Sequence, residues 1–353
     1  MQKVDYIIVG YGVAAVCFAG LCLSRQKSFV IFDDGEKAAS HIAAGMFNPI
    51  ILYRFTSVFK GWEQMKSLQT AFSRLENLVQ TKVIYKIPVY RILADAEEAK
   101  IWEKKAVQDA ILNEFLNPVV IENNFKNIKA DYGFGEVYNT GRIDFSQLLF
   151  QFSQKFQSFF RNEKFIFSEL DLKNNSYQNI KFNHLIFAEG IKVENNPYFN
   201  FIPIIKNKGE TLIIESDAEL PEIAFKSKSF LMPLGNKKYY VGSTYDKKFN
   251  SPEITTENRI SLENNLQSFF KGNYKVVSHQ AGLRPTTGDR RGIIGQHPKF
   301  DALHVLNGLG THGAMNAAYL AEMLFNKIED NQSILPEFDV KRWYASYFKR
   351  NKK

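Results

Sequence analysis

Alternation between apolar runs and amphipathic stretches opens the chain with a strand, a helix and a second strand. Residues 6–9 (Tyr-Ile-Ile-Val) form a fully apolar run of the kind that is buried in parallel sheets. Residues 13–24 have the pattern of a helix of small residues, and residues 28–32 that of the next strand. The order predicts a βαβ unit over residues 4–33.

Later segments alternate between helical and strand-like patterns. Apolar residues at spacings of three and four predict helices over residues 57–80 and 95–115. A further amphipathic helix is predicted from Ile143 to Phe152, and a last one from Gly313 to Ile328. Strand-like runs occupy residues 165–167, 184–187, 211–214, 229–232 and 239–241, with Gly235-Asn236 as a hairpin turn before the last of them.

This succession predicts an α/β protein with a Rossmann-type domain and a discontinuous α+β domain built on a mostly antiparallel sheet. A length of 353 residues suits two domains. Segments that fit a nucleotide-binding domain alternate with segments that do not. We therefore expect one domain to contain residues 1–80, 141–203 and 281–353, and the other to contain residues 81–140 and 204–280.

Charge and cysteine content restrict the partners and the compartment. The formal net charge is +8, which attracts polyanions, but the basic residues are spread along the chain. Cys17 and Cys22, the two cysteines, lie in one apolar segment and are expected to be buried thiols in a reducing compartment. No cysteines and histidines have the spacing of zinc ligands, so no metal site is expected.

The charge-free run from Tyr6 to Leu23 resembles a signal sequence only in part. Gly10 and Gly12 interrupt it, and a second strand pattern follows at once. A βαβ unit explains the whole pattern, so we expect a cytoplasmic protein without a membrane anchor.

Residues 10–15 (Gly-Tyr-Gly-Val-Ala-Ala) follow the first strand and open the first helix, as a dinucleotide-binding fingerprint does. Gly10 allows the tight turn, Gly12 lets the backbone approach a pyrophosphate, and Ala15 keeps the helix close to the strand. The amides at the helix N-terminus, at Val13 and Ala14, are expected to face the phosphates.

An acidic residue completes the fingerprint. Asp33 ends the second strand, where a carboxylate accepts hydrogen bonds from a ribose hydroxyl. Asp34 is the alternative if the register differs by one residue.

The fingerprint alone fits either FAD or NAD, and further segments of the chain favour FAD. The most specific are Gly282-Leu-Arg-Pro-Thr-Thr-Gly-Asp289 and Asn307-Gly-Leu-Gly-Thr-His-Gly313; the others are residues 39–46, 185–190, 208–210 (a KGQ-type turn) and 242–244. Their order, from residue 4 to about residue 328, resembles the D-amino-acid oxidase/glycine oxidase superfamily of flavoproteins.

The resemblance implies an FAD site made by four segments besides the fingerprint. FAD is expected to be noncovalent, because Ile42 rather than His41 stands where some relatives attach it through a histidine. The residues expected at the cofactor are Ser40, Ala44, Gly45, Met46, Ala188, Gly190, Arg284, Gly308, Gly310, Thr311, His312 and Gly313.

Two of these residues are the catalytic candidates. Arg284 is expected to pair with a substrate carboxylate, a task that suits a planar guanidinium; the alternative is a salt bridge between domains. The helix that starts near Gly313 directs its positive end at the reduced flavin, and His312 is expected to donate in the same direction. Asp289 is expected to hold its loop or a neighbouring arginine.

The resemblance also has a departure at the substrate. Phe230 stands where the family often has a tyrosine, so one expected hydroxyl is missing. Tyr239 or Tyr240 could replace it, although core packing is the better interpretation of both.

The activity implied is oxidation of an amine, amino acid or imino acid by hydride transfer to flavin N5, with a small-molecule substrate. A second interpretation is an FAD-dependent tRNA wobble-uridine modification enzyme that cleaves a carboxymethylaminomethyl group, with tRNA as the partner. A third is a flavin-binding protein without turnover, since function depends on the site rather than on the fold.

Overall fold

The first three elements of the chain form the expected βαβ unit. The computed structural model describes residues 1–246 and 251–350. Strand β1 (Gln2–Val9), helix α1 (Val13–Ser24) and strand β2 (Phe29–Phe32) follow one another, and β1 and β2 pair in parallel. Cys17 and Cys22 are buried free thiols within α1.

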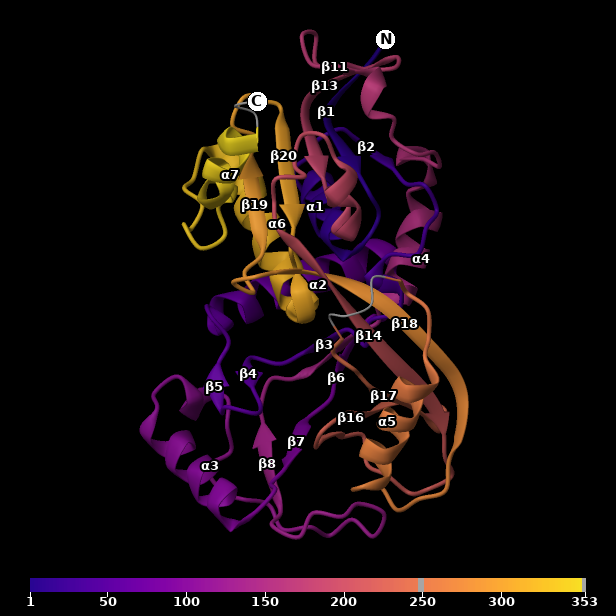
Figure 1. Ribbon diagram of the computed structural model, residues 1–353, viewed down its shortest axis with the longest axis vertical. Helices are drawn as coiled ribbons and strands as arrows, with labels where there is room; N and C mark the ends of the chain where they lie inside the picture. Colours follow the sequence, from indigo (N-terminus) through magenta and orange to yellow (C-terminus); the bar gives the residue numbers. More distant parts are fainter. Residues whose placement is uncertain (247–250, 351–353) are drawn as a thin grey trace.

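The βαβ unit belongs to an eight-stranded sheet in the upper part of Figure 1. Its strand order is β10-β2-β1-β13-β12-β11. Strand β20 also pairs with β13, and β19 pairs with β20. The parallel pairs join β10 to β2, β2 to β1, β1 to β13 and β13 to β20. The other members are β10 (Phe160–Arg161), β11 (Leu170–Asp171), β12 (Ser176–Tyr177), β13 (Ile180–Phe187), β19 (Ile293–Gln296) and β20 (Leu303–Asn307).

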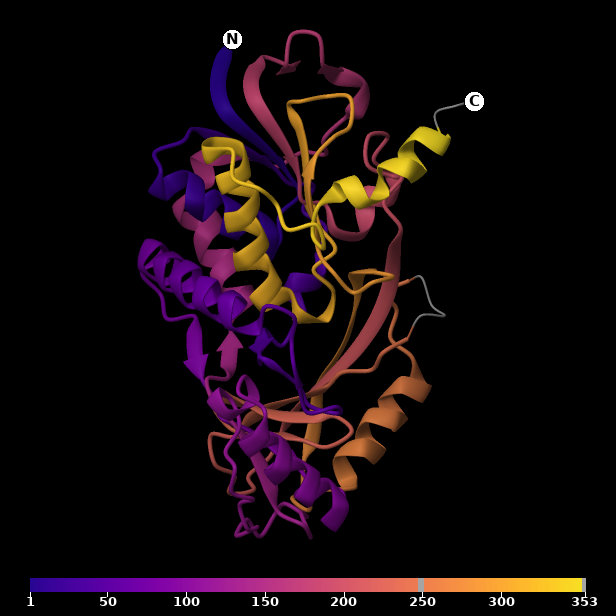
Figure 2. The ribbon, with the colours of Figure 1, turned by 90° about the vertical axis from the view of Figure 1, so that its left-hand side faces the viewer.

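Helices cover one face of this sheet. Figure 2 shows α2 (Gly61–Val79), α4 (Phe145–Lys155) and α6 (Gly313–Asp330) stacked on one side, and α1 packs with them into one apolar core. The opposite face packs against aromatic residues and the C-terminal helix α7 (Tyr344–Arg350).

A seven-stranded sheet forms the lower part of Figure 1, in the order β18-β14-β17-β16-β15-β7-β8. All its pairs are antiparallel except the parallel pair of β15 and β7. Helix α5 (Thr256–Gln267) packs on one face and α3 (Ala96–Gln108) on the other. Its strands are β7 (Val89–Ile92), β8 (Phe134–Val137), β14 (Ile204–Glu215), β15 (Ala224–Lys226), β16 (Phe230–Gly235), β17 (Lys238–Gly242) and β18 (Lys275–Thr287).

Two small sheets lie between the large ones. Strands β3 (Met46–Phe47), β9 (Gly141–Ile143) and β6 (Ile84–Lys86) form the first, in that order, and β4 (Ile50–Ile51) pairs with β5 (Thr56–Ser57) in the second. Short 3₁₀ turns connect the elements: η1 (Ala39–His41), η2 (Leu112–Glu114), η3 (Gln157–Phe159), η4 (Phe167–Glu169), η5 (Gly190–Asn195), η6 (Gly310–His312) and η7 (Val340–Trp343).

Several local predictions were wrong. Residues 165–167 form no strand, because the Phe165 ring stacks on Tyr177 at 4.1 Å and fills the core instead of joining the sheet. Ile143 ends β9, and α4 begins only at Phe145, where the Asp144 carboxylate accepts from the amide of Gln147 and caps the helix.

The third error concerns residues 208–210, which were expected to turn. They lie in the middle of β14, because the charges of Lys208 and Glu210 neutralise each other on a buried face. Helix α5 was also missed within the region expected to be β-rich, and the helix predicted for residues 95–115 ends at Gln108.

The two-domain division remains our proposal. Strand β18 runs without interruption through the expected boundary at residue 281, so the long strands β14 and β18 link the two large sheets (Figure 1). No helix in residues 1–246 or 251–350 has the length and apolar character needed to cross a membrane.

Candidate active site

The carboxyl ends of the parallel strands β1, β2, β13 and β20 meet at one edge of the first sheet, the place where open α/β sheets bind ligands. Gly10 follows β1 with φ +95°, and a Cβ there would lie 2.7 Å from the carbonyl oxygen of Ala188. The tight turn expected of Gly10 therefore brings the fingerprint against the end of β13.

The N-terminus of α1 faces the loop of residues 39–46. Gly12 is the N-cap of the helix, and the amide of Val13 donates to Ser40 Oγ at 3.1 Å. Ala14 and Ala15 follow in the first turn, whose amides have no partner within the helix. The loop and the fingerprint thus lie against each other at the N-terminus of α1.

Gly45 fixes the other end of this loop. Its φ is +68°, and a Cβ would lie 1.8 Å from the carbonyl oxygen of Ile143, so no other residue fits. Met46 then starts β3, which pairs with β9 opposite Arg142, and Ala44 and Met46 pack towards the second sheet. The loop accordingly spans the space between the two large sheets.

The two acidic candidates have different surroundings. Asp34 forms an ion pair with Lys192, which overcomes the effect of burial and lowers the pKa of Asp34. Asp33 is half-buried at the end of β2, and burial raises the pKa of its carboxyl. Lys192 thus engages Asp34, whereas Asp33 forms no ion pair with the described residues, and its contact with a ribose hydroxyl remains a prediction.

Residues 307–313 bring the glycine-rich segment to the same edge. Asn307 Nδ2 donates to the carbonyl oxygen of Gly190 at 2.9 Å and joins β20 to the turn after β13. Gly308 and Gly310 have φ values of +70° and +61°. A Cβ at Gly310 or Gly313 would meet no atom of the described residues within 4 Å. The start of α6 therefore borders open space.

His312 is the N-cap of α6, and its Nδ1 lies 3.3 Å from Oγ1 of Thr311. Burial and the nearby Arg290 both lower the pKa of His312. The imidazole is therefore neutral at pH 7 and has one N–H to donate.

Arg284 lies on β18, in the seven-stranded sheet. Its guanidinium donates to Ser243 Oγ at 2.6 Å and to Asn207 Oδ1 at 3.2 Å, and it lies directly above Gly209. Within the described part of the chain no carboxylate pairs with Arg284. A salt bridge between domains, the alternative role, is thus not formed by these residues.

Two polar atoms on the sheet face that carries Arg284 have no partner among the described residues. Asn207 Nδ2 and Thr286 Oγ1 are buried and form no hydrogen bond within residues 1–246 and 251–350. Pairing in β14 and β18 places both side chains on the same face of the sheet as Arg284. Buried donors of this kind are rare in folded proteins unless a ligand or water satisfies them, which indicates a binding site.

The two tyrosines have different environments. Tyr239 packs in the core beneath α5, whereas Tyr240 lies on the opposite face, together with Met46 and Phe230. Burial raises the pKa of Tyr240, and the neighbouring Arg284 opposes this effect. Tyr240 thus supplies a hydroxyl near the guanidinium, which Phe230 cannot do.

Asp289 has the structural role expected of it. Its carboxylate accepts from the amide of Arg291 at 3.0 Å and from Nε of Arg342 at 3.1 Å. The guanidinium of Arg342 also donates to the carbonyl oxygen of Gly292. Asp289 therefore ties the C-terminal segment to the loop after β18.

The residues at this edge fit FAD. Two helix N-termini have amides suited to negative charge, the Asp33 carboxylate is an acceptor of the kind that a ribose hydroxyl requires, and the described residues leave space beside Gly310 and Gly313. Sequence reasoning missed Asn207 and Thr286, for which the only signal is their alternation with Lys208 and Pro285 along β14 and β18.

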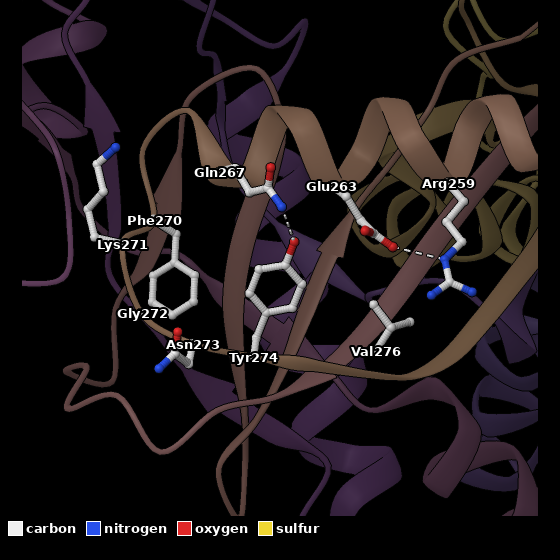
Figure 3. A pocket seen from close by; sticks show the side chains of 9 residues that line it. All are labelled: Arg259, Glu263, Gln267, Phe270, Lys271, Gly272, Asn273, Tyr274 and Val276. Atoms are coloured by element: carbon white, nitrogen blue, oxygen red, sulfur yellow. Dashed lines mark hydrogen bonds and ion pairs between the residues drawn. The ribbon is translucent and has the colours of Figure 1, made fainter.

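A separate hollow of about 550 Å³ lies between α5 and the start of β18 (Figure 3). Four of its polar side chains are paired, because Arg259 pairs with Glu263 and Gln267 donates to the hydroxyl of Tyr274. The hollow contains none of the expected site residues.

Fold and site together define an oxidoreductase that depends on a flavin. The family model described as FAD dependent oxidoreductase (DAO) matches residues 5–326, and the chain belongs to this family. The family model thus confirms the FAD cofactor and the resemblance seen in the sequence.

Curated relatives are similar over part of their length. Glycine oxidase of Bacillus subtilis (strain 168) is 27% identical over 175 residues, covering 45% of this chain and 46% of the relative. The tRNA 5-methylaminomethyl-2-thiouridine biosynthesis bifunctional protein MnmC of Idiomarina loihiensis is 22% identical over 156 residues, covering 42% of this chain and 25% of the relative. The matches thus span half or less of these relatives.

A solved structure shows the same fold over nearly the whole chain. Glycine oxidase from Geobacillus kaustophilus superimposes with a TM-score of 0.81 at 14% identity and covers 97% of this chain and 98% of that one.

Proposed function

We propose that this protein oxidises the C–N bond of a small amine that carries a carboxylate, an amino or imino acid, in the cytoplasm. The observation that carries the proposal is Arg284, a half-buried guanidinium that donates to Ser243 and Asn207 but pairs with no carboxylate among the described residues. A substrate carboxylate would complete its bidentate hydrogen bonding.

The chain's own residues would bind and orient the substrate. Bound FAD supplies the hydride acceptor. Arg284 would hold the carboxylate, with Asn207 and Tyr240 beside it. Met46 and Phe230, half-buried between the loop and the sheet, would cover the substrate and exclude water. The N-terminus of α6 and the neutral His312 would stabilise negative charge at the end of the ring nearest to them.

Anaerobic bleaching of the flavin absorbance tests the proposal, with glycine, sarcosine, D-amino acids and proline as substrates. In the Arg284→Met variant the KM of the reactive amine is expected to rise about a hundredfold, equivalent to about 3 kcal/mol, because a charged hydrogen bond to the carboxylate is lost. Arg284→Lys should recover part of the loss, since it keeps the charge but not the fork.

Arg259→Met is the matched control, because Arg259 is an arginine of the distant hollow in Figure 3. Its KM should equal that of the unaltered protein. An unchanged KM in Arg284→Met would sink the proposal.

A second function is favoured by the similarity to MnmC, whose name describes biosynthesis of a modified tRNA uridine. The net charge of +8 suits a phosphate-rich partner. Bleaching by total tRNA but by none of the free amines would favour it, and an absence of tRNA binding at low salt would eliminate it.

A further inference from the structure

The face of the second sheet that carries Arg284 has a row of residues running away from it. The register aligns Thr211 of β14 with Gly242 of β17, Gly242 with Phe230 of β16, and Phe230 with Lys226 of β15. Residues that pair across strands point to the same face. Lys226 therefore lies on the same face as Arg284, at the far side of Phe230.

No acidic side chain of the described residues neutralises the charge of Lys226. Its Nζ lies 5.0 Å from the centre of the Phe230 ring and donates to the carbonyl oxygen of Lys228 at 2.7 Å. Within residues 1–246 and 251–350 it forms no ion pair, whereas the adjacent Arg91 pairs with Glu98 at 2.7 Å. The far end of the row thus carries a net positive charge.

Both cations are confined but reachable from solvent. Burial lowers the pKa of Arg284, and burial followed by the nearby Arg91 lowers the pKa of Lys226 to about 8. Yet the hydrogen bonds from Arg284 to Ser243 and from Lys226 to Lys228 are both solvent-exposed. Each cationic group is therefore partly shielded by the protein and still in contact with solvent.

We propose that Lys226 binds a second anionic group of the substrate, a carboxylate or phosphate at the end remote from the group held by Arg284. The proposal rests on the function proposed above. Gly209, beneath the guanidinium, and Lys226 are three strands apart, so the two backbone positions are separated by about 14 Å across the sheet. The substrate would then be longer than a simple amino acid.

Calorimetry on the oxidised holoenzyme tests the second anion without requiring turnover. Dicarboxylates from succinate to dodecanedioate are compared with the monocarboxylates of the same length. Beyond the length that reaches Lys226, the dicarboxylate should bind at least about tenfold tighter than its monocarboxylate, because it gains a charged hydrogen bond.

Three variants test whether Lys226 is responsible for the tighter binding of the dicarboxylate. Lys226→Met keeps the length of the side chain but removes the charge, and should abolish the gain while leaving monocarboxylate binding unchanged. Lys226→Arg should retain it. Lys228→Met removes an exposed charge two residues away and should have no effect, which separates Lys226 from the general charge of the surface.

A parallel comparison of uridine with uridine 5′-monophosphate identifies the source of the anion. Tighter binding of the nucleotide that depends on Lys226 indicates a nucleotide phosphate, and a dicarboxylate gain alone indicates a free diacid. Equal binding within both pairs, or a gain that survives Lys226→Met, overturns the proposal.

The two proposals fail differently. If no amine bleaches the flavin but the Lys226-dependent gain is present, the proposed function is wrong and the anion site remains. If a simple amino acid bleaches the flavin and no second anion improves binding, the function remains and the anion site is wrong.

Discussion

The two faces of strand β14 differ in whether their charged groups are paired with opposite charges. On one face Lys208 and Glu210 are almost fully buried and lie 2.8 Å apart. On the other face Asn207 and Gly209 lie beneath Arg284, whose guanidinium pairs with no carboxylate among the described residues. Lys208 and Glu210 thus belong to a network in which opposite charges are paired, called here the closed network. Asn207 and Arg284 belong to a network without a carboxylate among the described residues, called here the open network.

The closed network surrounds Glu210 with donors. Besides Lys208, its carboxylate accepts from the amide and hydroxyl of Thr255, from Asn258 Nδ2 and from His279 Nε2. These donors come from the start of α5 and from β18, so Glu210 joins three elements. A buried polar network in which every member is satisfied rigidifies the fold.

The closed network also positions the open one. The amide of Glu210 donates to Thr244 Oγ1 at 2.8 Å, and the amide of Thr244 donates to the carbonyl oxygen of Glu210 at 3.0 Å. Thr244 follows Ser243, which accepts from Arg284. The comparison shows that a buried network whose polar groups are all hydrogen-bonded stabilises the fold. A neighbouring group of polar atoms with unused hydrogen-bonding capacity indicates a binding site.

Breaking the closed network should have the largest effect. Glu210→Gln is expected to lower the free energy of unfolding by about 3 kcal/mol, because it leaves Lys208 buried without its counter-charge. Urea denaturation of the holoenzyme measures the change.

Glu263→Gln is the matched control. Its carboxylate pairs with Arg259 on the surface of α5, where such a pair contributes less than about 1 kcal/mol. Equal stability losses in the two variants would contradict the distinction between the faces.

The same network predicts an acid dependence. Burial alone would raise the pKa of Glu210, but the hydrogen bonds from Lys208, Asn258 and Thr255 outweigh it and lower the pKa to about 2. A lowered pKa gives stability that is complete above the ordinary value of 4.5 and is lost as the pH falls towards 2. Between pH 6 and pH 3 the network should therefore lose about 2 kcal/mol.

Urea midpoints at pH 6 and pH 3 check this, with Glu210→Gln as the reference that has no carboxyl to titrate. The unaltered protein should lose more stability than the variant over this interval. Parallel losses would show that other carboxylates determine the acid response.

The cofactor edge was predictable because its signals are local. Gly10, Gly12 and Asp33 act through turn geometry and the end of one strand, and the structure brings them together with the distant Ala188 and Gly190 as the parallel sheet requires. The family model over residues 5–326 confirms the FAD cofactor, and the contacts of the individual residues with it remain predictions.

The polar surroundings of Arg284 were not predictable in this way. Asn207 and Ser243 are 77 and 41 residues from Arg284 in the chain, and they meet it only through the register of β14, β17 and β18. The sequence Lys208-Gly209-Glu210 has the composition of a turn, and a tertiary ion pair overrides that local preference.

A substitution on the face of β14 beneath Arg284 should have the smallest effect, and it should change substrate binding rather than stability. Asn207 accepts one hydrogen bond from Arg284, and its own Nδ2 is buried without a partner among the residues that the structure describes. Asn207→Leu removes that unsatisfied group, so the free energy of unfolding should change by less than about 0.5 kcal/mol. The KM of the reactive amine should rise about fivefold, since a hydrogen bond that orients the guanidinium contributes about 1 kcal/mol.

A double-mutant cycle decides whether Asn207 acts through Arg284. If it does, Asn207→Leu should leave the KM unchanged in an Arg284→Met background, because the group that it orients is absent. Additive effects on KM would mean that Asn207 contacts the substrate itself. A large loss of stability in the single variant would mean that this face of β14 is structural too, and that the contrast between its two faces is false.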